Sequence, residues 1–260
     1  ADVNHFHAAG GTAFVIRTLL DNGMLHDDVK TNWGEGLHNY TLEPRLESNK
    51  LAHVKGVQES GDTDVLRPAD KPFSQEGGLQ LLTGNLGRSV IKISAVAPEH
   101  RVVEAPARVF DDQLELQKAF ERGELEQDII AVVRFQGPAA NGMPELHKMT
   151  PYLGILQDRG FKVALVTDGR MSGASGKVPA AIHLTPEALA DGPIGKIRDG
   201  DMLRLDANSG ELISLVPQDE WVERSQAKRI SADSEYGTGR ELFGFMRNAV
   251  SEAEDGASVF

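Results

Sequence analysis

The sequence predicts an α/β protein whose larger part is a β-barrel-like domain with flanking helices. After Gly77, six short runs rich in β-branched residues follow one another, and turn residues divide them. These predicted strands are residues 90–96, 101–109, 128–135, 162–167, 202–206 and 211–216. Helical segments separate some of the runs, which is typical of a sheet with helices packed outside it.

Helices are predicted at residues 13–24, 113–122, 146–158 and 236–254. Gly23, Gly123 and Gly160 mark the ends of the first three, because glycine commonly follows the last turn of a helix. Residues 185–187, Thr-Pro-Glu, have the hydroxyl and the proline of a helix start. Residues 206–210 lie between two predicted strands and indicate a hairpin turn.

The first part of the chain differs from the rest in its composition and hydrophobic pattern. Residues 27–72 are polar and weakly patterned, which is typical of a linker or of functional loops. We therefore predict two domains: residues 1–65 are the tail of an α/β N-terminal domain plus a linker, and residues 66–260 are the barrel-like C-terminal domain. The chain opens on Ala1 with residues typical of a segment inside a longer protein, so we expect a fragment.

Composition excludes several classes of function. The 260 residues carry a net charge of −12, whereas a nucleic-acid partner requires a basic surface. No apolar run approaches the roughly 18 residues of a transmembrane helix, and no secretory signal opens the chain. We therefore expect a cytoplasmic protein without a membrane partner. The sequence has no cysteine, which excludes disulfides, a thiol nucleophile and thiolate-bound metals within this chain.

The densest group of reactive side chains follows the predicted strand 162–167. Residues 168–177 contain three glycines and two serines, together with Asp168, Arg170 and Lys177. Glycines let backbone N–H groups approach a ligand, and hydroxyls and cations add donors for an anion. A tight turn in which Asp168 pairs with Arg170 accounts for the same residues equally well.

A second loop follows the predicted strand 128–135 and ends at Glu145. Carboxylate oxygens are the ligands expected for a hard cation such as Mg²⁺. Taken alone, an acidic residue at this position is more often a helix-start residue favoured by the helix dipole.

Both loops resemble signatures of one family, that of dihydroxy-acid dehydratase and 6-phosphogluconate dehydratase. Residues 167–175 read Thr-Asp-Gly-Arg-Met-Ser-Gly-Ala-Ser, and residues 137–145 read Gly-Pro-Ala-Ala-Asn-Gly-Met-Pro-Glu. The resemblance extends to residues 4–11 and 83–87, and details at residues 64–68, 141–148, 175–183 and 239–243 favour the phosphogluconate branch.

The resemblance implies roles for individual residues. Ser172 matches the base that removes the proton beside the substrate carboxylate, and Glu145 matches a ligand of the divalent cation. The candidates for binding the substrate are Arg170, Ser175, Lys177 and His147. Each of the cationic candidates is equally explained as a solvated surface charge, and Ser175 as a helix cap.

The implied reaction removes water from 6-phospho-D-gluconate and yields 2-keto-3-deoxy-6-phosphogluconate, a step of the Entner–Doudoroff pathway. The implied cofactors are an iron–sulfur cluster, expected to be 4Fe–4S with its ligands outside this chain, and a divalent cation such as Mg²⁺. The implied partners are the missing N-terminal, cluster-binding domain and a second copy in a homodimer. Without the cluster cysteines, we expect the isolated chain to be inactive.

Two alternatives remain open. In the first, the chain is the C-terminal part of a dehydratase that acts on another sugar acid or on a dihydroxy acid. A reading from a different class is a non-catalytic module that has kept the fold and lost the chemistry.

Overall fold

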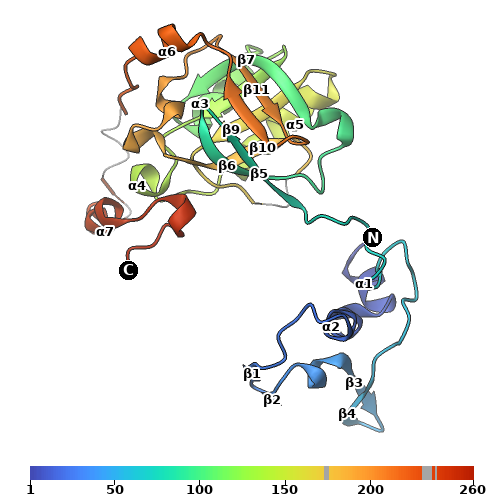
Figure 1. The fold of residues 1–260 in the computed structure, drawn as a ribbon. Helices are drawn as coiled ribbons and strands as arrows, with labels where there is room; N and C mark the ends of the chain where they lie inside the picture. Colours follow the sequence, from blue (N-terminus) through green and yellow to red (C-terminus); the bar gives the residue numbers. More distant parts are fainter. Residues whose placement is uncertain (173–175, 230–235, 238) are drawn as a thin grey trace. The chain divides into compact units, whose positions relative to one another are not determined.

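The computed structural model describes residues 1–172, 176–229, 236–237 and 239–260, and Figure 1 shows the course of the chain. The chain divides into two compact units, Ala1–Glu76 and Gly77–Phe260. This division rests on compactness alone, so the assignment of residues 1–65 and 66–260 to two domains of a larger protein stays a prediction.

The first unit combines two helices with short strands. Its elements are α1 (Val3–Ala8), α2 (Gly11–Asp21), β1 (Lys30–Thr31), β2 (Gly34–Glu35), η1 (His38–Thr41), β3 (Leu42–Glu47) and β4 (Lys50–Lys55). The predicted helix at 13–24 is confirmed as α2. The antiparallel pair β3–β4 was not predicted, because this largely exposed hairpin lacks an apolar face. Its turn places Ser48 and Asn49 at positive φ.

The second unit is a closed eight-stranded barrel in the order β10-β6-β5-β12-β11-β7-β8-β9. Its strands are β5 (Leu79–Gly84), β6 (Gly87–Lys92), β7 (Val102–Phe110), β8 (Ile129–Val133), β9 (Val163–Thr167), β10 (Ala180–Thr185), β11 (Met202–Asp206) and β12 (Glu211–Ser214). The predicted barrel-like α/β class is confirmed. β5 and β10 were not predicted, because their leucines, alanines and polar residues give little β-branched signal.

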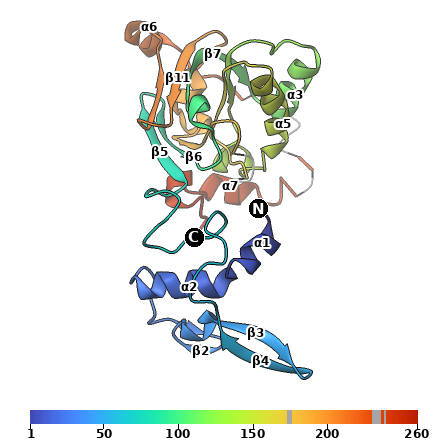
Figure 2. The same cartoon turned by 90° about the vertical axis from the view of Figure 1, so that its right-hand side faces the viewer.

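Four adjacent strands, β7 to β10, run parallel. Their carboxyl ends, at Phe110, Val133, Thr167 and Thr185, therefore lie at one end of the barrel. Helices α3 (Gln113–Glu121) and α5 (Thr150–Asp158) connect β7 to β8 and β8 to β9, and Figure 2 shows both on one side of the barrel. Loops that leave this end are placed side by side by the strand order.

The described residues of the barrel unit form two apolar clusters. One takes residues from all eight strands, including Leu82, Ile130 and Val166, and so fills the barrel interior. The other joins alternate residues of β8 and β9 to the helices α3 and α5. Every residue of β8 and β9 is buried, because the alternating side chains of each strand enter one cluster or the other.

The remaining elements are η2 (Pro98–His100), α4 (Pro138–Asn141), η3 (His147–Met149), η5 (Ala188–Ala190), η6 (Pro193–Lys196), α6 (Gln218–Glu223), α7 (Gly244–Ala249) and η7 (Ala253–Asp255). The predicted helix start at 185–187 is wrong. The Thr185–Pro186 peptide is cis, and the segment that follows forms only the short η5. The N–H of Ala188 donates to the side chain of Asp168, and the N–H of Gly192 donates to the carbonyl of Glu187, so these groups do not continue a helix.

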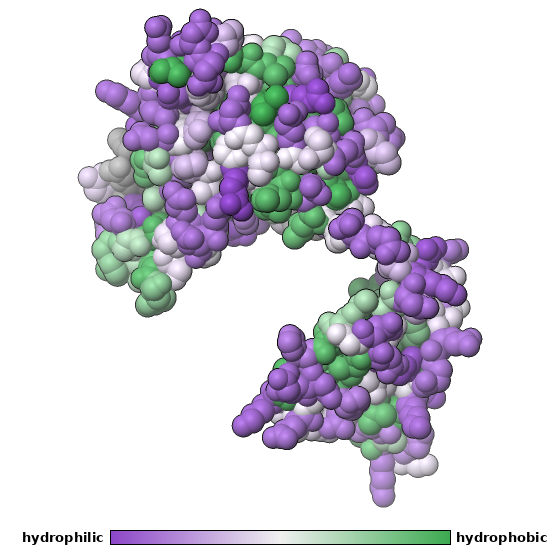
Figure 3. Space-filling model, in the orientation of Figure 1, coloured by the Kyte–Doolittle hydropathy of each residue, from purple (hydrophilic) through white to green (hydrophobic). Residues whose placement is uncertain are grey.

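The predicted helix at 236–254 is wrong in extent. Among the described residues of this segment, α7 covers only Gly244–Ala249, and Val250 is extended. The N–H of Ser251 then donates to the carbonyl of Ser258, which turns the chain back on itself. Apolar side chains gather on the surface around this end of the chain (Figure 3), where Leu242, Phe243 and Phe245 are exposed.

The predicted hairpin at 206–210 is confirmed, since β11 and β12 pair antiparallel across it. Across the described ranges, the structure contains no helix with both the length and the apolar character needed to span a bilayer.

Candidate active site

The two loops singled out in the sequence leave neighbouring parallel strands and meet again beyond them. β8 and β9 pair along their whole length, and a further isolated bridge links Glu145 to Arg170. The N–H of Leu146 donates to the carbonyl of Arg170 at 3.2 Å. The loop ending at Glu145 is thus held against the turn that carries Ser172.

Glu145 is the point at which the loops converge. Its Oε1 accepts hydrogen bonds from the backbone nitrogens of Ser172, at 2.7 Å, and His147, at 3.1 Å. Its Oε2 accepts from Nη1 of Arg170 at 3.0 Å. Its side chain keeps 31% of its surface exposed, so the carboxylate is both anchored and accessible.

Arg170 spans the two loops. While Nη1 holds the carboxylate of Glu145, Nε donates to the carbonyl of Met143 at 2.7 Å. The alternative of a tight turn closed by an Asp168–Arg170 pair is therefore wrong. The carboxylate of Asp168 accepts instead from the backbone nitrogens of Phe135, Gln136 and Ala188.

Two buried carboxylates lie beneath these loops. Burial raises the pKa of Asp168 to about 6, against the opposing effect of its three backbone donors. Burial also raises the pKa of Glu187, whose oxygens accept from the backbone nitrogens of Ala139 and Ala140. Neither residue was among the predicted site residues, although Asp168 lies in the loop 168–177 and in the signature Thr-Asp-Gly-Arg. Glu187 was part of the helix start predicted at residues 185–187.

His183 is a third residue near the site. The sequence places it in an apolar run, which favours a core or interface position. In the structure it is half-buried at an irregularity of β10, with φ of 56°, and its N–H donates to the carbonyl of Gly169. Burial, and then the nearby charge of Arg170, lower the pKa of its ring. Nothing in the sequence predicts the bulge that brings His183 close to Arg170.

The predicted substrate-binding residues divide into three groups. Arg170 and His147 contact Glu145, with Nδ1 of His147 3.9 Å from Oε1. Lys177 forms an ion pair with Asp158 at the end of α5. Lys177 and His147 also line one cavity of about 470 Å³. Ser175 lies outside the described residues.

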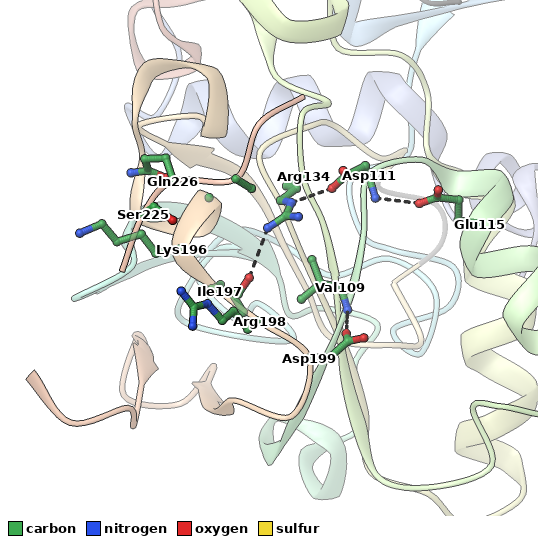
Figure 4. A pocket seen from close by; sticks show the side chains of 12 residues that line it. Val109, Asp111, Glu115, Arg134, Lys196, Ile197, Arg198, Asp199, Ser225 and Gln226 are labelled. Atoms are coloured by element: carbon green, nitrogen blue, oxygen red, sulfur yellow. Dashed lines mark hydrogen bonds and ion pairs between the residues drawn. The ribbon is translucent and has the colours of Figure 1, made fainter. Parts of the chain in front are cut away.

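A different pocket opens beside the carboxyl ends of β7 and β8, with a volume of about 430 Å³ (Figure 4). Arg134 points into it, donating from Nε to Asp111 at 2.6 Å and from Nη1 to the carbonyl of Ile197 at 3.2 Å. None of the predicted site residues lines this pocket. We assign no substrate to it, because neither Glu145 nor Ser172 lines it.

Comparison with known proteins decides the family. The profile of the dihydroxy-acid/6-phosphogluconate dehydratase C-terminal domain matches residues 64–257. The chain belongs to this dehydratase family. The resemblance stated from the two loop motifs is thereby confirmed.

Individual members of the dehydratase family align with almost the whole chain. Phosphogluconate dehydratase of Pseudomonas aeruginosa is 64% identical over 260 residues, and that of Escherichia coli K12 is 53% identical over 258 residues. Dihydroxy-acid dehydratase of Sulfurisphaera tokodaii is 36% identical over 222 residues, or 84% of the chain. The chain spans 43% of the length of each of the first two relatives and 37% of the third.

The carboxylate of Glu145 can serve as a ligand of the divalent cation that is expected for a dehydratase of this family. A carboxylate has about four lone-pair positions, and three N–H donors occupy three of them at Glu145. Counting donors from the described residues alone, one position remains, which suits a Mg²⁺ ion that takes one or two protein carboxylates and completes its shell with water and substrate. Within the described part of the chain, no group of three or more His, Cys, Asp or Glu side chains is placed to hold a metal by itself.

The iron–sulfur cluster expected for the dehydratases does not fit this chain. Such clusters are held by cysteine thiolates, and the 260 residues contain no cysteine.

Proposed function

We propose that this chain acts as the C-terminal part of a dehydratase that converts 6-phospho-D-gluconate to 2-keto-3-deoxy-6-phosphogluconate. The observation that supports this most directly is the 2.7 Å hydrogen bond between the backbone nitrogen of Ser172 and the carboxylate of Glu145. The two residues are 27 positions apart, and each belongs to a motif that resembles a signature of the dehydratase family.

In this proposal Ser172 removes the proton from C2 of the substrate, the bond between C3 and its hydroxyl oxygen breaks so that water is lost overall, and the resulting enol tautomerises to the 2-keto-3-deoxy acid. A serine hydroxyl has too high a pKa to act as a base unaided, so a nearby positive charge must favour its alkoxide. Glu145 would hold a divalent cation, which would supply that charge and polarise the substrate carboxylate. Arg170 keeps the Glu145 carboxylate in place and adds positive charge on the same side of the site.

The phosphate group of the proposed substrate needs local donors, because the net charge of −12 opposes capture of an anion by the overall field. His147 and Lys177 are the candidates, since both line one cavity, and the backbone nitrogen of His147 also donates to Glu145. Identities of 64% and 53% to two phosphogluconate dehydratases, against 36% to a dihydroxy-acid dehydratase, favour the phosphorylated sugar acid.

Substitution in the full-length protein tests the base. We expect Ser172→Ala to lower kcat by about 10³-fold or more, while Ser209→Ala, in the exposed β11–β12 turn, leaves kcat unchanged. Equal kcat for Ser172→Ala and wild type would remove Ser172 from the mechanism. Comparing 6-phosphogluconate with gluconate and with a branched-chain 2,3-dihydroxy acid separates the proposed substrate from the alternatives.

We also propose that the family's iron–sulfur cluster is held outside these 260 residues, and that the full-length protein is a homodimer. The first part follows from the absence of cysteine. The purified 260-residue chain should therefore show no turnover of 6-phosphogluconate, and measurable turnover would contradict the proposal. Light scattering of the full-length protein checks the dimer.

A further inference from the structure

Asp168 carries a carboxylate that the proposed chemistry does not use. It is the first residue after β9 and is fully buried. Its Oδ1 accepts from the nitrogen of Gln136 at 2.9 Å, and its Oδ2 accepts from those of Phe135 at 3.1 Å and Ala188 at 3.0 Å. These donors follow β8 and β10, so one carboxylate ties together the ends of three adjacent parallel strands.

Glu187 adds further hydrogen bonds of the same kind, to the backbone of the loop that leads to Glu145. Its Oε1 accepts from the nitrogen of Ala139 at 2.9 Å, and its Oε2 accepts from that of Ala140 at 3.1 Å. The side chain is 7% exposed and fits closely against the backbone. A Cβ on Gly137 would lie 2.0 Å from Oε2 of Glu187, so only glycine permits this approach.

The loop between β8 and Glu145 contains two strained positions. Phe135 has φ of 61° and Met143 has φ of 52°, a region that bulky side chains rarely occupy and that surrounding contacts must stabilise. The N–H of Phe135 is held by Asp168, and the carbonyl of Met143 is held by Arg170. The two strained residues thus bracket the loop, and each is fixed by a side chain from the turn after β9.

We propose that Asp168 is a positioning residue for the dehydration site: by fixing the start of the loop after β8, it sets where Glu145 meets Ser172. This inference rests on the proposed function. Asp168 is not a catalytic residue, because its oxygens are taken by backbone donors and it has no exposed surface. It acts through the loop that carries the metal ligand.

A matched control exists at the other end of the barrel. Asp206 is 7% exposed and accepts from the backbone nitrogens of Asn208 and Ser209 in the turn after β11. It pairs with Val102, the first residue of β7, and so lies where the parallel strands begin. Asp168→Asn and Asp206→Asn each replace a buried turn carboxylate with an amide, but only the first lies beneath the site.

The test compares both variants in the full-length protein. We expect both to lose thermal stability, while only Asp168→Asn lowers kcat, by about 10-fold or more, with KM changed by less than about threefold. Amide hydrogen exchange should rise over residues 135–147 and 169–172 in Asp168→Asn, and over residues 207–214 in Asp206→Asn. Equal effects of the two variants on kcat, or unchanged exchange at residues 135–147, would overturn the positioning role.

A second variant covers the case in which Asp168→Asn fails to fold. Glu187→Gln keeps one acceptor oxygen, and we expect faster exchange at residues 139–145 with a smaller loss of kcat. Unchanged exchange and unchanged kcat in this variant would overturn the inference. Hydrogen exchange also separates the positioning role of Asp168 from the proposed function. Full activity of Ser172→Ala would contradict the proposed function, whereas the exchange data on Asp168→Asn and Glu187→Gln would still test the positioning role.

Discussion

Nη1 of Arg170 lies 3.0 Å from Oε2 of Glu145, and the same guanidinium reaches the carbonyl of Met143 through Nε. Two donors on one rigid plane therefore fix both the carboxylate and the backbone that precedes it. A lysine offers charge without this fork, because its ammonium cannot reproduce the planar geometry. The site depends on the shape of Arg170 as well as on its charge.

Arg170→Lys is expected to lower kcat/KM of the full-length protein by roughly 10- to 100-fold, which corresponds to about 1.4 to 2.7 kcal/mol. Steady-state kinetics on 6-phosphogluconate measures the change. The control is Arg45→Lys, since the exposed guanidinium of Arg45 lies 3.6 Å from Glu43 in the first unit and belongs to neither loop of the site. If kcat/KM of Arg170→Lys equals that of the wild type, the positive charge at this position is enough and the planar guanidinium is not required.

Glu145→Gln is expected to weaken binding of the divalent cation. The amide keeps the shape of the side chain but loses the negative charge that a hard cation prefers. The Mg²⁺ concentration that half-activates the full-length protein should rise about 10-fold or more. Glu211→Gln, in the β12 strand and paired with Arg204, should leave that concentration unchanged. An unchanged Mg²⁺ requirement in Glu145→Gln would remove the metal role.

Asp168 should make the stability of the chain depend on pH. Its folded pKa of about 6 lies above the ordinary value of 3.8, so the folded state binds the proton more tightly than the unfolded state. Its contribution is fully present below about pH 4 and is lost as the pH rises to about 6, a change of roughly 3 kcal/mol. Urea unfolding of wild type and Asp168→Asn from pH 4 to 7 isolates this slope, which the variant should lack. Parallel profiles in the two proteins would contradict the prediction.

Gly137→Ala should destabilise the barrel unit by about 1 to 3 kcal/mol, because the added methyl group would overlap the carboxylate of Glu187. Gly154→Ala is the matched control. Gly154 lies within α5 with open space around its Cα, so alanine there should stabilise the helix by about 0.5 to 1 kcal/mol. Thermal unfolding monitored by circular dichroism measures both changes. A stability loss at Gly154 equal to that at Gly137 would show that the Glu187 contact has no special effect.

The fold was predictable where the sequence pattern is local. β8, β9, β11 and the hairpin after Asp206 follow from β-branched runs and turn residues. Strand β10 was missed because Ala180–Thr185 reads as weakly patterned, and its pairing with β6 and β9 comes from distant segments. The helix start after Thr185 failed for the same reason, since the partner of Ala188 is Asp168, twenty positions away.

The candidate site divides along similar lines. Composition drew attention to the two loops, but it was the resemblance to the dehydratase family that selected Glu145 and Ser172 within them. The part played by Arg170 was open, because the sequence cannot show whether it pairs with Asp168 beside it or with Glu145 on another loop. The buried positions of Asp168 and Glu187 depend on strand order, which periodicity does not encode.

The double burial of β8 and β9 has a consequence for how the barrel unit melts. Both apolar clusters contain side chains of β8 and β9, so we expect the two clusters to unfold together. The loops that hold Glu145 and Ser172 are rooted in these strands at Val133 and Thr167. Heating should therefore leave the geometry at Glu145 intact until the entire barrel gives way in a single cooperative step.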